Sequence, residues 1–193
     1  MTAAIHYSLS VIRFFRSIRG SLPPDYKELE TKMAAQYEIT DKHFDMLTVR
    51  ELYEILRARE QVFIIEQNCP YDDIDGKDVF SYHLFMKRAD GSVAACLRVF
   101  MKPDEPNTAQ IGRVVTTERG AGLGRILLHA GVEKAFSMGA DEIYLEAQEY
   151  AQGFYAKEGF VTVSDPFLED GIPHVKMRRR RRAAGPDSRH RAL

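Results

Sequence analysis

A glycine-rich run in the middle of the chain carries the strongest chemical signal in the sequence. It reads Arg119-Gly-Ala-Gly-Leu-Gly124 and lies between a predicted strand and a predicted helix. Glycines let the backbone approach a ligand closely, and the first amides of a helix are unpaired at the positive end of its dipole. The run therefore predicts a phosphate-binding turn. A tight strand-to-helix connection without a ligand is the alternative.

Two common phosphate motifs do not fit this run. A P-loop requires Gly-x4-Gly-Lys-Ser/Thr, and that pattern does not occur in the sequence. The dinucleotide fingerprint G-x-G-x-x-G would need a glycine where Arg125 follows Gly120 and Gly122. The run is therefore assigned to neither of these two kinds of site.

The cysteines and histidines show no spacing typical of a redox or metal site. Cys69 and Cys96 stand far apart and outside any Cys-x-x-Cys motif, which indicates a reducing compartment without a disulfide scaffold. The six histidines lack metal-ligand spacing, so we predict no metal. No apolar run approaches the roughly 20 residues that a membrane helix needs. A cytoplasmic protein without a membrane partner is expected.

The formal net charge of −1 hides an asymmetry along the chain. Residues 176–193 carry eight Lys or Arg against one acid, a charge of +7, which leaves −8 for the other 175 residues. A basic substrate would be drawn to the acidic body, and an acidic polymer mainly to the tail. The run Arg178–Arg182 has no interleaved aromatics and no recognised nucleic-acid motif, so only incidental nucleic-acid contacts are expected there.

The chain divides into an extension, one domain and a tail. Residues 1–40 place apolar side chains at helical spacing with arginines between them, which predicts a helix packed on the domain or a poorly ordered leader. Contact of this basic amphipathic segment with a membrane surface is the alternative. Residues 41–177 form the predicted domain, and residues 178–193 a basic, disordered tail.

Helical and strand patterns alternate through the predicted domain, which indicates an α/β (α+β) fold. A capping box, Thr48-Val-Arg-Glu51, begins a helix that runs towards Glu66. The turn Ala89-Asp-Gly91 joins two predicted strands into a hairpin. The predicted strands are 82–87, 92–101, 110–116, 142–147, 160–164 and 174–177, and the later helices are 122–138 and 150–158.

Several motifs in one order resemble the GNAT acetyltransferases, and within them the ElaA-type subfamily. Arg119-x-x-Gly122-x-Gly124 matches the Arg/Gln-x-x-Gly-x-Gly/Ala signature of that superfamily. The resemblance covers roughly residues 45–177. The other motifs that carry it are Val62-Phe-Ile-Ile-Glu-Gln67, Cys69-Pro-Tyr-Asp72, Ile111-Gly-Arg-Val114, Ala147-Gln148, Phe154-Tyr155-x-x-x-Gly159-Phe160 and Glu169-Asp-Gly-Ile-Pro-His174.

This resemblance implies a mixed central sheet, splayed between its fourth and fifth strands and flanked by helices. It also implies acetyl-CoA as co-substrate. The opening would expose backbone amides of Val114, Val115 and Thr116 to the pantetheine arm, with Gln148 as a further contact. Arg113, on the same strand, could reach the substrate cleft or pair with an acid. The residues expected to bind the pyrophosphate are Arg119, Gly120, Ala121, Gly122, Leu123 and Gly124, with Arg125 adding positive charge.

The resemblance also assigns catalytic roles. Tyr155 is expected to donate a proton to the leaving thiolate, and Glu66 or His174 to take a proton from the amine. Each residue also has a purely structural alternative. Tyr155 would be a core aromatic, Glu66 a carboxylate at a helix end, and His174 a histidine after a turn. Glu169 and Asp170 could fix a cationic substrate or belong only to that turn.

The expected activity is direct N-acetyl transfer to an amine within a ternary complex. The amine could belong to a small molecule or to a protein, and a homodimer is possible. A coenzyme-binding protein without turnover and a transferase with another acyl donor are the alternatives.

Overall fold

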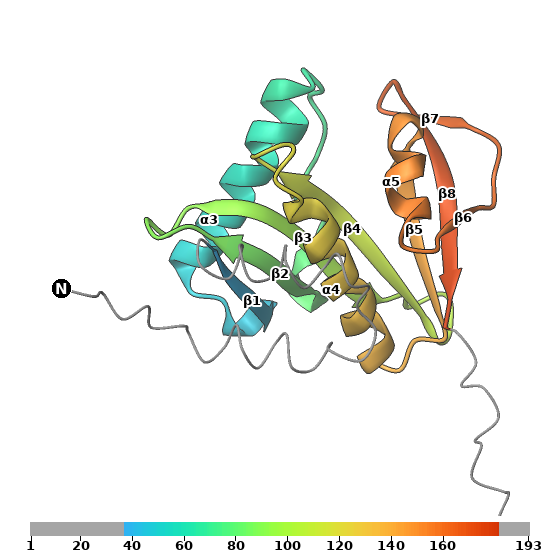
Figure 1. The fold of residues 1–193 in the computed structure, drawn as a ribbon, viewed down its shortest axis with the longest axis horizontal. Coiled ribbons are helices and arrows are strands. Elements are labelled where there is room, and N and C mark those ends of the chain that lie inside the picture. The colour runs from blue at the N-terminus through green and yellow to red at the C-terminus, as the bar shows by residue number, and fades with distance from the viewer. Residues whose placement is uncertain (1–36, 182–193) are drawn as a thin grey trace, which may run out of the picture.

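The computed structural model describes residues 37–181, which form a single mixed sheet with helices on both faces (Figure 1). The strand order is β1-β2-β3-β4-β5-β8-β6, with β7 paired to β8. All neighbours are antiparallel except β4 and β5, which are parallel. The strands are β1 Glu38–His43, β2 Tyr82–Lys87, β3 Val93–Met101, β4 Thr108–Thr116, β5 Glu142–Gln148, β6 Val161–Thr162, β7 Phe167–Glu169 and β8 Ile172–Arg180.

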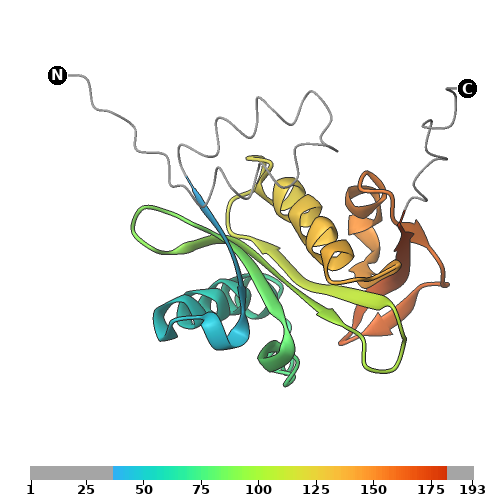
Figure 2. The same ribbon diagram turned by 90° about the horizontal axis from the view of Figure 1, so that it is seen from below.

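Helix α3 lies on one face of the sheet, and α4 and α5 lie on the other (Figure 2). Helix α3 begins at the predicted capping box, where the Thr48 side chain accepts from the Glu51 amide at 3.2 Å and the Glu51 carboxylate accepts from the Thr48 amide at 2.9 Å. The helices are α3 Val49–Arg59, which continues as a π-helical turn Glu60–Glu66, then α4 Leu123–Ser137 and α5 Gln152–Ala156, with short 3-10 turns at Phe44–Met46, Asp78–Phe80 and Glu149–Ala151.

Each face of the sheet buries its own hydrophobic cluster. The larger cluster lies on the side of α4 and includes Ile111, Leu127 and Leu145. The smaller one lies under α3 and includes Phe85, Cys96 and Val115. On α4, a Cβ at Gly131 would stand 3.0 Å from the Leu97 side chain, so the helix lies close to the sheet and a larger residue there would require Leu97 to shift.

Strands β4 and β5 pair over a short distance and then diverge. Thr108, Ala109 and Gln110 pair with Glu142, Ile143 and Tyr144, and the parallel register ends there. Beyond Gln110 the two strands lead into separate arms, one with β1–β4 and one with β5–β8 (Figure 1). The predicted splay between the fourth and fifth strands is confirmed.

A β-bulge in β4 lies where the two arms diverge. Gly112 pairs with Arg98 and Val115 with Cys96, so Arg113 and Val114 together face one residue of β3. Arg113 has φ +54°, which is uncommon for a residue other than glycine. Since Ile111 belongs to the cluster on the α4 side and Val115 to the cluster under α3, the bulge reverses which side chains face which helix layer.

The arginine run belongs largely to the last strand rather than to a tail. Arg178, Arg179 and Arg180 lie in β8, so the expectation of a disordered segment from residue 178 is wrong for these positions. Arg178 pairs with Glu105 at 2.8 Å and with Glu142.

The other three described arginines of the run are also engaged within the fold. Arg180 pairs with Glu142 at 3.0 Å and Arg179 with Glu158 at 3.5 Å. Arg181 donates to backbone carbonyls at Phe136 and Ala140. These partners lie on both sides of the sheet. Arginines that point to either face of β8 are therefore bound by an acceptor.

The domain also begins earlier than expected. Strand β1 starts at Glu38, inside the predicted extension 1–40, and β7 was not predicted at all. Residues 1–36 and 182–193, including the predicted N-terminal helix and the end of the predicted tail, lie outside the described residues.

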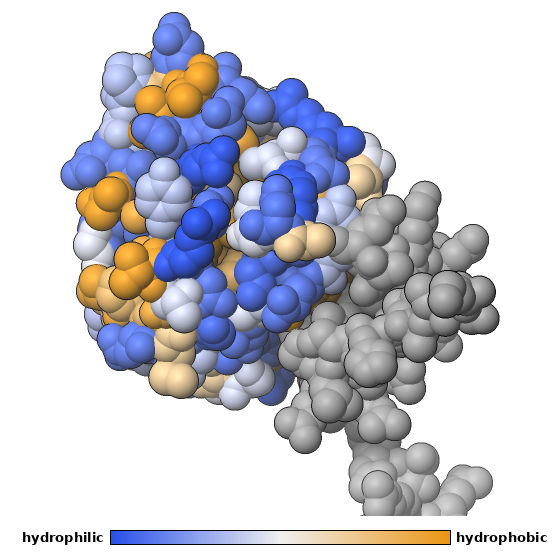
Figure 3. Space-filling model, turned by 90° about the vertical axis from the view of Figure 1, so that its left-hand side faces the viewer, coloured by the Kyte–Doolittle hydropathy of each residue, from blue (hydrophilic) through white to orange (hydrophobic). Residues whose placement is uncertain are grey.

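The surface on the β1 and α3 side mixes hydrophilic and hydrophobic side chains (Figure 3). Hydrophobic side chains there form small separate groups. In α3 and the 3-10 turn before it, the exposed apolar residues include Met46, Val49 and Tyr53. Among the residues 37–181, no helix is long and apolar enough to cross a bilayer.

Candidate active site

The diverging part of β4 borders the opening between the two arms. Val115 and Thr116 pair with Cys96 and Ala95 on β3, while the opposite edge of the strand has left β5. A strand directs its backbone groups alternately to its two edges, so an edge without a partner strand presents free amides and carbonyls. Val114, Val115 and Thr116 therefore lie on the part of β4 that borders the opening.

The glycine-rich turn follows this edge directly and begins α4. Gly120 and Gly122 both have φ +78°, in the left-handed region that favours glycine. Gly122 is the N-cap of α4 and supplies no side-chain cap, and the first helical bond runs from the Ile126 amide to the Gly122 carbonyl at 3.3 Å. The amides of Leu123 and Gly124 therefore have no carbonyl of the helix to bind, an arrangement suited to an anion.

The start of α4 packs tightly on the neighbouring elements. A Cβ at Gly124 would lie 3.1 Å from the Thr116 side chain and 3.5 Å from the Phe154 ring. The turn, the end of β4 and helix α5 thus meet at one point. Since α5 also carries Tyr155, the phenol belongs to the same side of the opening as the turn.

Tyr155 lies in an aromatic cluster. Its ring contacts Phe154 edge-on with centroids 5.1 Å apart, and Phe160 at 6.2 Å. Burial, with a smaller contribution from Tyr150, raises the pKa of Tyr155 above its ordinary value. The side chain is therefore a stable proton donor at neutral pH, and it also packs against the core.

A short segment, Glu66–Cys69, connects the two arms; we call it the bridging segment. Glu66 pairs with Arg119 of the glycine turn at 2.6 Å. Gln67 accepts from Gln148 at the end of β5 at 3.0 Å. The Cys69 thiol donates to the backbone carbonyl of Asp170, between β7 and β8, at 3.5 Å. The bridging segment thus contains one predicted site residue, Glu66, and contacts two others, Arg119 and Gln148.

His174 lies beside Gln148 on the neighbouring strand and on the sheet face that carries α3. The two residues pair directly in the β5–β8 register, and Ala147 and Val175 next to them face the core on the α4 side. Because side chains alternate along a strand, Gln148 and His174 point to the opposite face. His174 and Tyr155 therefore approach the opening from different sides of the sheet.

The hydrogen bond of His174 fixes which nitrogen is basic. Its Nδ1 lies 2.8 Å from the Ile172 carbonyl, which can only accept, so neutral Nδ1 carries the hydrogen. The lone pair is then on Nε2, 3.9 Å from a carboxylate oxygen of Glu169. The Nε2 lone pair therefore remains available, with the Glu169 carboxylate close to it.

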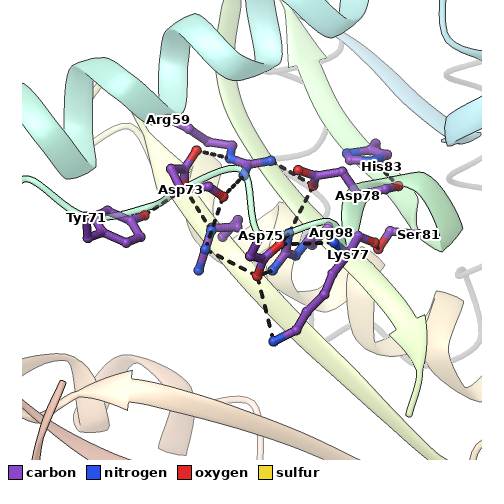
Figure 4. Close-up of polar contacts among 10 residues, drawn as sticks. Arg59, Tyr71, Asp73, Asp75, Lys77, Asp78, Ser81, His83 and Arg98 are labelled. Atoms are coloured by element: carbon purple, nitrogen blue, oxygen red, sulfur yellow. Dashed lines mark hydrogen bonds and ion pairs between the residues drawn. The ribbon is translucent and has the colours of Figure 1, made fainter. Parts of the chain in front are cut away.

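Charged residues also form a buried network between α3, the sheet and the loop before β2 (Figure 4). Arg59, at 1% exposure, donates to Asp73 and Asp78 at 2.8 Å each. Arg98, at 3% exposure, binds both carboxylate oxygens of Asp75 and reaches Asp78 at 3.1 Å. Burial opposes ionisation of Asp75, but hydrogen bonds from Arg98 and the Lys77 amide hold its pKa well below the usual range.

Arg113 completes this network, which the sequence analysis did not find. Its side chain pairs with Asp73 at 2.8 Å and with Asp75 at 3.4 Å, and lies over the Tyr71 ring with its central carbon 5.3 Å from the centroid. Of the two roles left open for Arg113, pairing with acids is the one observed. The available signal was the series of aspartates in the loop, Asp73, Asp75 and Asp78, which have no local basic partners except Lys77.

A mixed sheet that opens between β4 and β5, with an anion-suited helix start beside the opening, defines the GNAT fold. The family model described as "Acetyltransferase (GNAT) domain" matches residues 81–181. The chain belongs to the GNAT acetyltransferase family, and its similarity within that family is to ElaA-type proteins.

Relatives over most of the domain support this assignment. A UPF0039 protein of Schizosaccharomyces pombe is 41% identical over 145 residues, which is 73% of this chain and 95% of the relative. Protein ElaA of Escherichia coli is 39% identical over 147 residues, 74% of this chain and 95% of the relative.

Solved structures agree with these sequence relatives. A Pseudomonas aeruginosa protein described as an acyl-CoA N-acyltransferase has a TM-score of 0.69 at 40% identity and covers 74% of this chain and 99% of its own. The crystal structure of Escherichia coli ElaA has a TM-score of 0.69 at 37% identity, with the same coverage of both chains. A coenzyme A thioester is the co-substrate that this fold suggests. Residues 37–181 contain no group of three or more His, Cys, Asp or Glu that could hold a metal ion.

Gly120→Ala tests the glycine turn. A Cβ at Gly120 meets nothing within 4 Å, so the effect comes from the left-handed backbone, which costs about 1–2 kcal/mol for alanine. We expect that loss of stability together with at least about tenfold weaker coenzyme A binding, a 1.4 kcal/mol effect, measured by urea unfolding and calorimetric titration.

Gly139→Ala is the matched control, with φ +95° and equally open space at the far end of α4. It should lose similar stability and keep its affinity for coenzyme A. Equal affinities in the two variants would contradict a binding role for the turn.

Proposed function

We propose that the protein is an N-acetyltransferase that moves the acetyl group of acetyl-CoA directly to an amine while both substrates are bound. The observation that carries this proposal is the opening of β4 from β5 beside the start of α4, with Tyr155 and His174 on opposite faces of the sheet. An activated thioester in the opening would then have a proton donor on one side and a proton acceptor on the other.

The donor would lie along the free edge of β4. Backbone groups of Val114, Val115 and Thr116 would bind the pantetheine arm, and the turn from Arg119 to Gly124 would bind the diphosphate, with Arg125 near it. Gln148 is the further pantetheine candidate, and its hydrogen bond to Gln67 of the bridging segment supports this role. The coenzyme supplies the activated acyl group, and the protein supplies its position.

The transfer itself needs proton movements at the amine nitrogen and at the leaving sulfur. An amine with a pKa near 10 must lose a proton, and His174 Nε2 can take it. The amine nitrogen then attacks the thioester carbonyl carbon and passes its second proton to solvent as the tetrahedral intermediate collapses to the amide. In that collapse the C–S bond breaks, and its electron pair leaves on sulfur. Tyr155 donates its phenolic proton to that thiolate and regains one from solvent. Glu66, paired with Arg119, is the second candidate for the base.

Direct transfer is favoured over an acyl-cysteine intermediate. Cys96 is fully buried in β3, and burial raises the pKa of its thiol to about 12, so a reactive thiolate does not form at neutral pH. Cys69 is buried as well, and its thiol donates to the Asp170 carbonyl. Both thiols are free, as suits the cytoplasmic location that we propose.

Two alternatives remain within the same fold. The Pseudomonas relative is described as an acyl-CoA N-acyltransferase, so a longer acyl donor is the first. A larger thermal shift with longer acyl-CoA thioesters than with acetyl-CoA would favour it. Coenzyme binding without turnover is the second. The acceptor could be a small-molecule or a protein amine, and a homodimer fits the proposal equally.

Thiol release from acetyl-CoA, measured across a panel of small amines and peptides, tests the proposed function. A product heavier than the amine by one acetyl group, found by mass spectrometry, is the expected result. Coenzyme binding without release on any amine would contradict enzymatic activity with those acceptors.

Tyr155→Phe removes the phenolic hydroxyl and keeps the ring contacts with Phe154 and Phe160. We expect kcat to fall about a hundredfold, because general acid catalysis is lost, with little change in the donor KM. The raised pKa of Tyr155 keeps the phenol protonated to pH 10 and beyond, so wild-type kcat should show no alkaline loss from this group below that pH. A kcat profile from pH 6 to 10 measures both effects. A variant within threefold of wild type would restrict Tyr155 to a packing role.

His174→Gln and Glu66→Gln distinguish the two candidate bases. We expect His174→Gln to lower kcat/KM for the amine about a hundredfold and Glu66→Gln to lower it less than fivefold. The reason is that His174 Nε2 has a free lone pair, whereas the Glu66 carboxylate is paired with Arg119. Steady-state kinetics at pH 8 measure the difference, and the reverse order would assign the base to Glu66.

A further inference from the structure

The loop Tyr71–Asp75 has no regular secondary structure, yet two of its aspartates, Asp73 and Asp75, each pair with two arginines. Asp73 is bound by Arg59, by Arg113 and by the Tyr71 hydroxyl at 2.7 Å. Asp72 and Ile74, on the other side of the loop, are exposed. The loop therefore turns one edge towards the network and presents the other edge to solvent.

This loop continues directly from the bridging segment and lies on the face of the sheet that carries α3. Arg59 at the end of α3 donates to the Asp73 side chain and to its backbone carbonyl, both at 2.8 Å. The glycine turn, α4 and α5 lie on the opposite face (Figure 2). Since the diphosphate site is at the start of α4, the donor approaches from the α4 side, and the α3 side is left for the amine.

Arg113 joins the loop to the bulge of β4. Its Nε lies 2.8 Å from an Asp73 oxygen, and its terminal nitrogen lies 3.2 Å from the Asp73 carbonyl and 3.4 Å from Asp75. Its guanidinium also covers the Tyr71 ring. Arg98 and Arg59 bind the same aspartates from β3 and α3, but Arg113 is the member of the network that precedes Val114 at the opening.

The backbone of Arg113 is part of the same arrangement. A φ of +54° is strained for a residue with a Cβ, and such conformations concentrate at functional sites. Glycine would adopt it without that strain, so an arginine stands at a position whose backbone suits glycine.

We propose that Arg113 is a positioning residue for the amine acceptor, holding the loop Tyr71–Asp75 at the α3 side of the opening. The inference rests on the proposed acyl transfer. Arg113 does not touch the reacting atoms; it fixes the wall along which the amine reaches the carbonyl. Its loss raises the acceptor KM and leaves the donor site as it is.

Arg113→Gly is the test, because it removes the side chain and keeps a residue suited to the bulge. The acceptor KM should rise at least tenfold while the donor KM stays within twofold, and hydrogen exchange of the loop amides should become faster. Arg113→Lys keeps the charge and loses the planar fork that spans Asp73 and Asp75, so it should raise the acceptor KM in the same way.

Asn107→Gly is the matched control. Asn107 is an exposed residue with φ +57° in the β3–β4 connection, so the change relieves the same kind of backbone conformation far from the loop. It should leave both KM values and the loop exchange at wild-type levels.

Several outcomes would overturn the proposal. An unchanged acceptor KM in Arg113→Gly, or an equal rise in both KM values, would do so. If Arg113→Gly does not fold, Arg113→Lys decides by the same criteria. If the wild type acetylates no amine, the proposed function fails. Hydrogen exchange then still tests whether Arg113 holds the loop Tyr71–Asp75, because the loop amides should exchange faster in Arg113→Gly than in Asn107→Gly. Unchanged exchange would then overturn it.

Discussion

The short parallel pairing between β4 and β5 is the constraint on which the rest of the structure depends. Three residues of each strand pair at one end, and beyond them the sheet becomes two arms with separate supports. On the first arm α4 packs closely on β3 and β4 at Gly131; on the second, β8 pairs with β5 along the whole length of β5. The opening exists because each arm packs on partners of its own, which leaves the edge of β4 beyond Gln110 without a partner strand.

The two faces of this opening differ in chemistry. The α4 side offers backbone amides, a helix start and a buried phenol, which suit an anionic thioester. The α3 side offers an imidazole, an amide pair and a wall held by balanced charges: three arginines against three aspartates, Arg59, Arg98 and Arg113 with Asp73, Asp75 and Asp78. Because removing one partner from a buried ion pair costs about 3–5 kcal/mol, such a wall resists deformation.

Much of the fold could be predicted from the sequence, and the limits have physical causes. Strand 82–87 was placed correctly, and the helix after the glycine turn to within one residue at each end. Strand β1 was missed because it lies at the edge of the sheet and buries mainly Ile39, so no apolar alternation marks it. The bulge has no local signal, since Arg113 stands where a glycine would have indicated positive φ. The candidate site residues were predicted from the family resemblance. The charge network could not be predicted in that way, because its members contact residues up to 40 positions away in the sequence.

The arginines of β8 have a consequence for how basic termini are interpreted. A boundary drawn at residue 177 would cut the last strand and leave Glu105, Glu142 and Glu158 without cations that they bind. Positive charge at a chain end is commonly taken as an affinity for polyanions. Here the arginines complete the last strand of the domain. The carboxylates that neutralise them belong to the same chain, up to 73 positions earlier in the sequence.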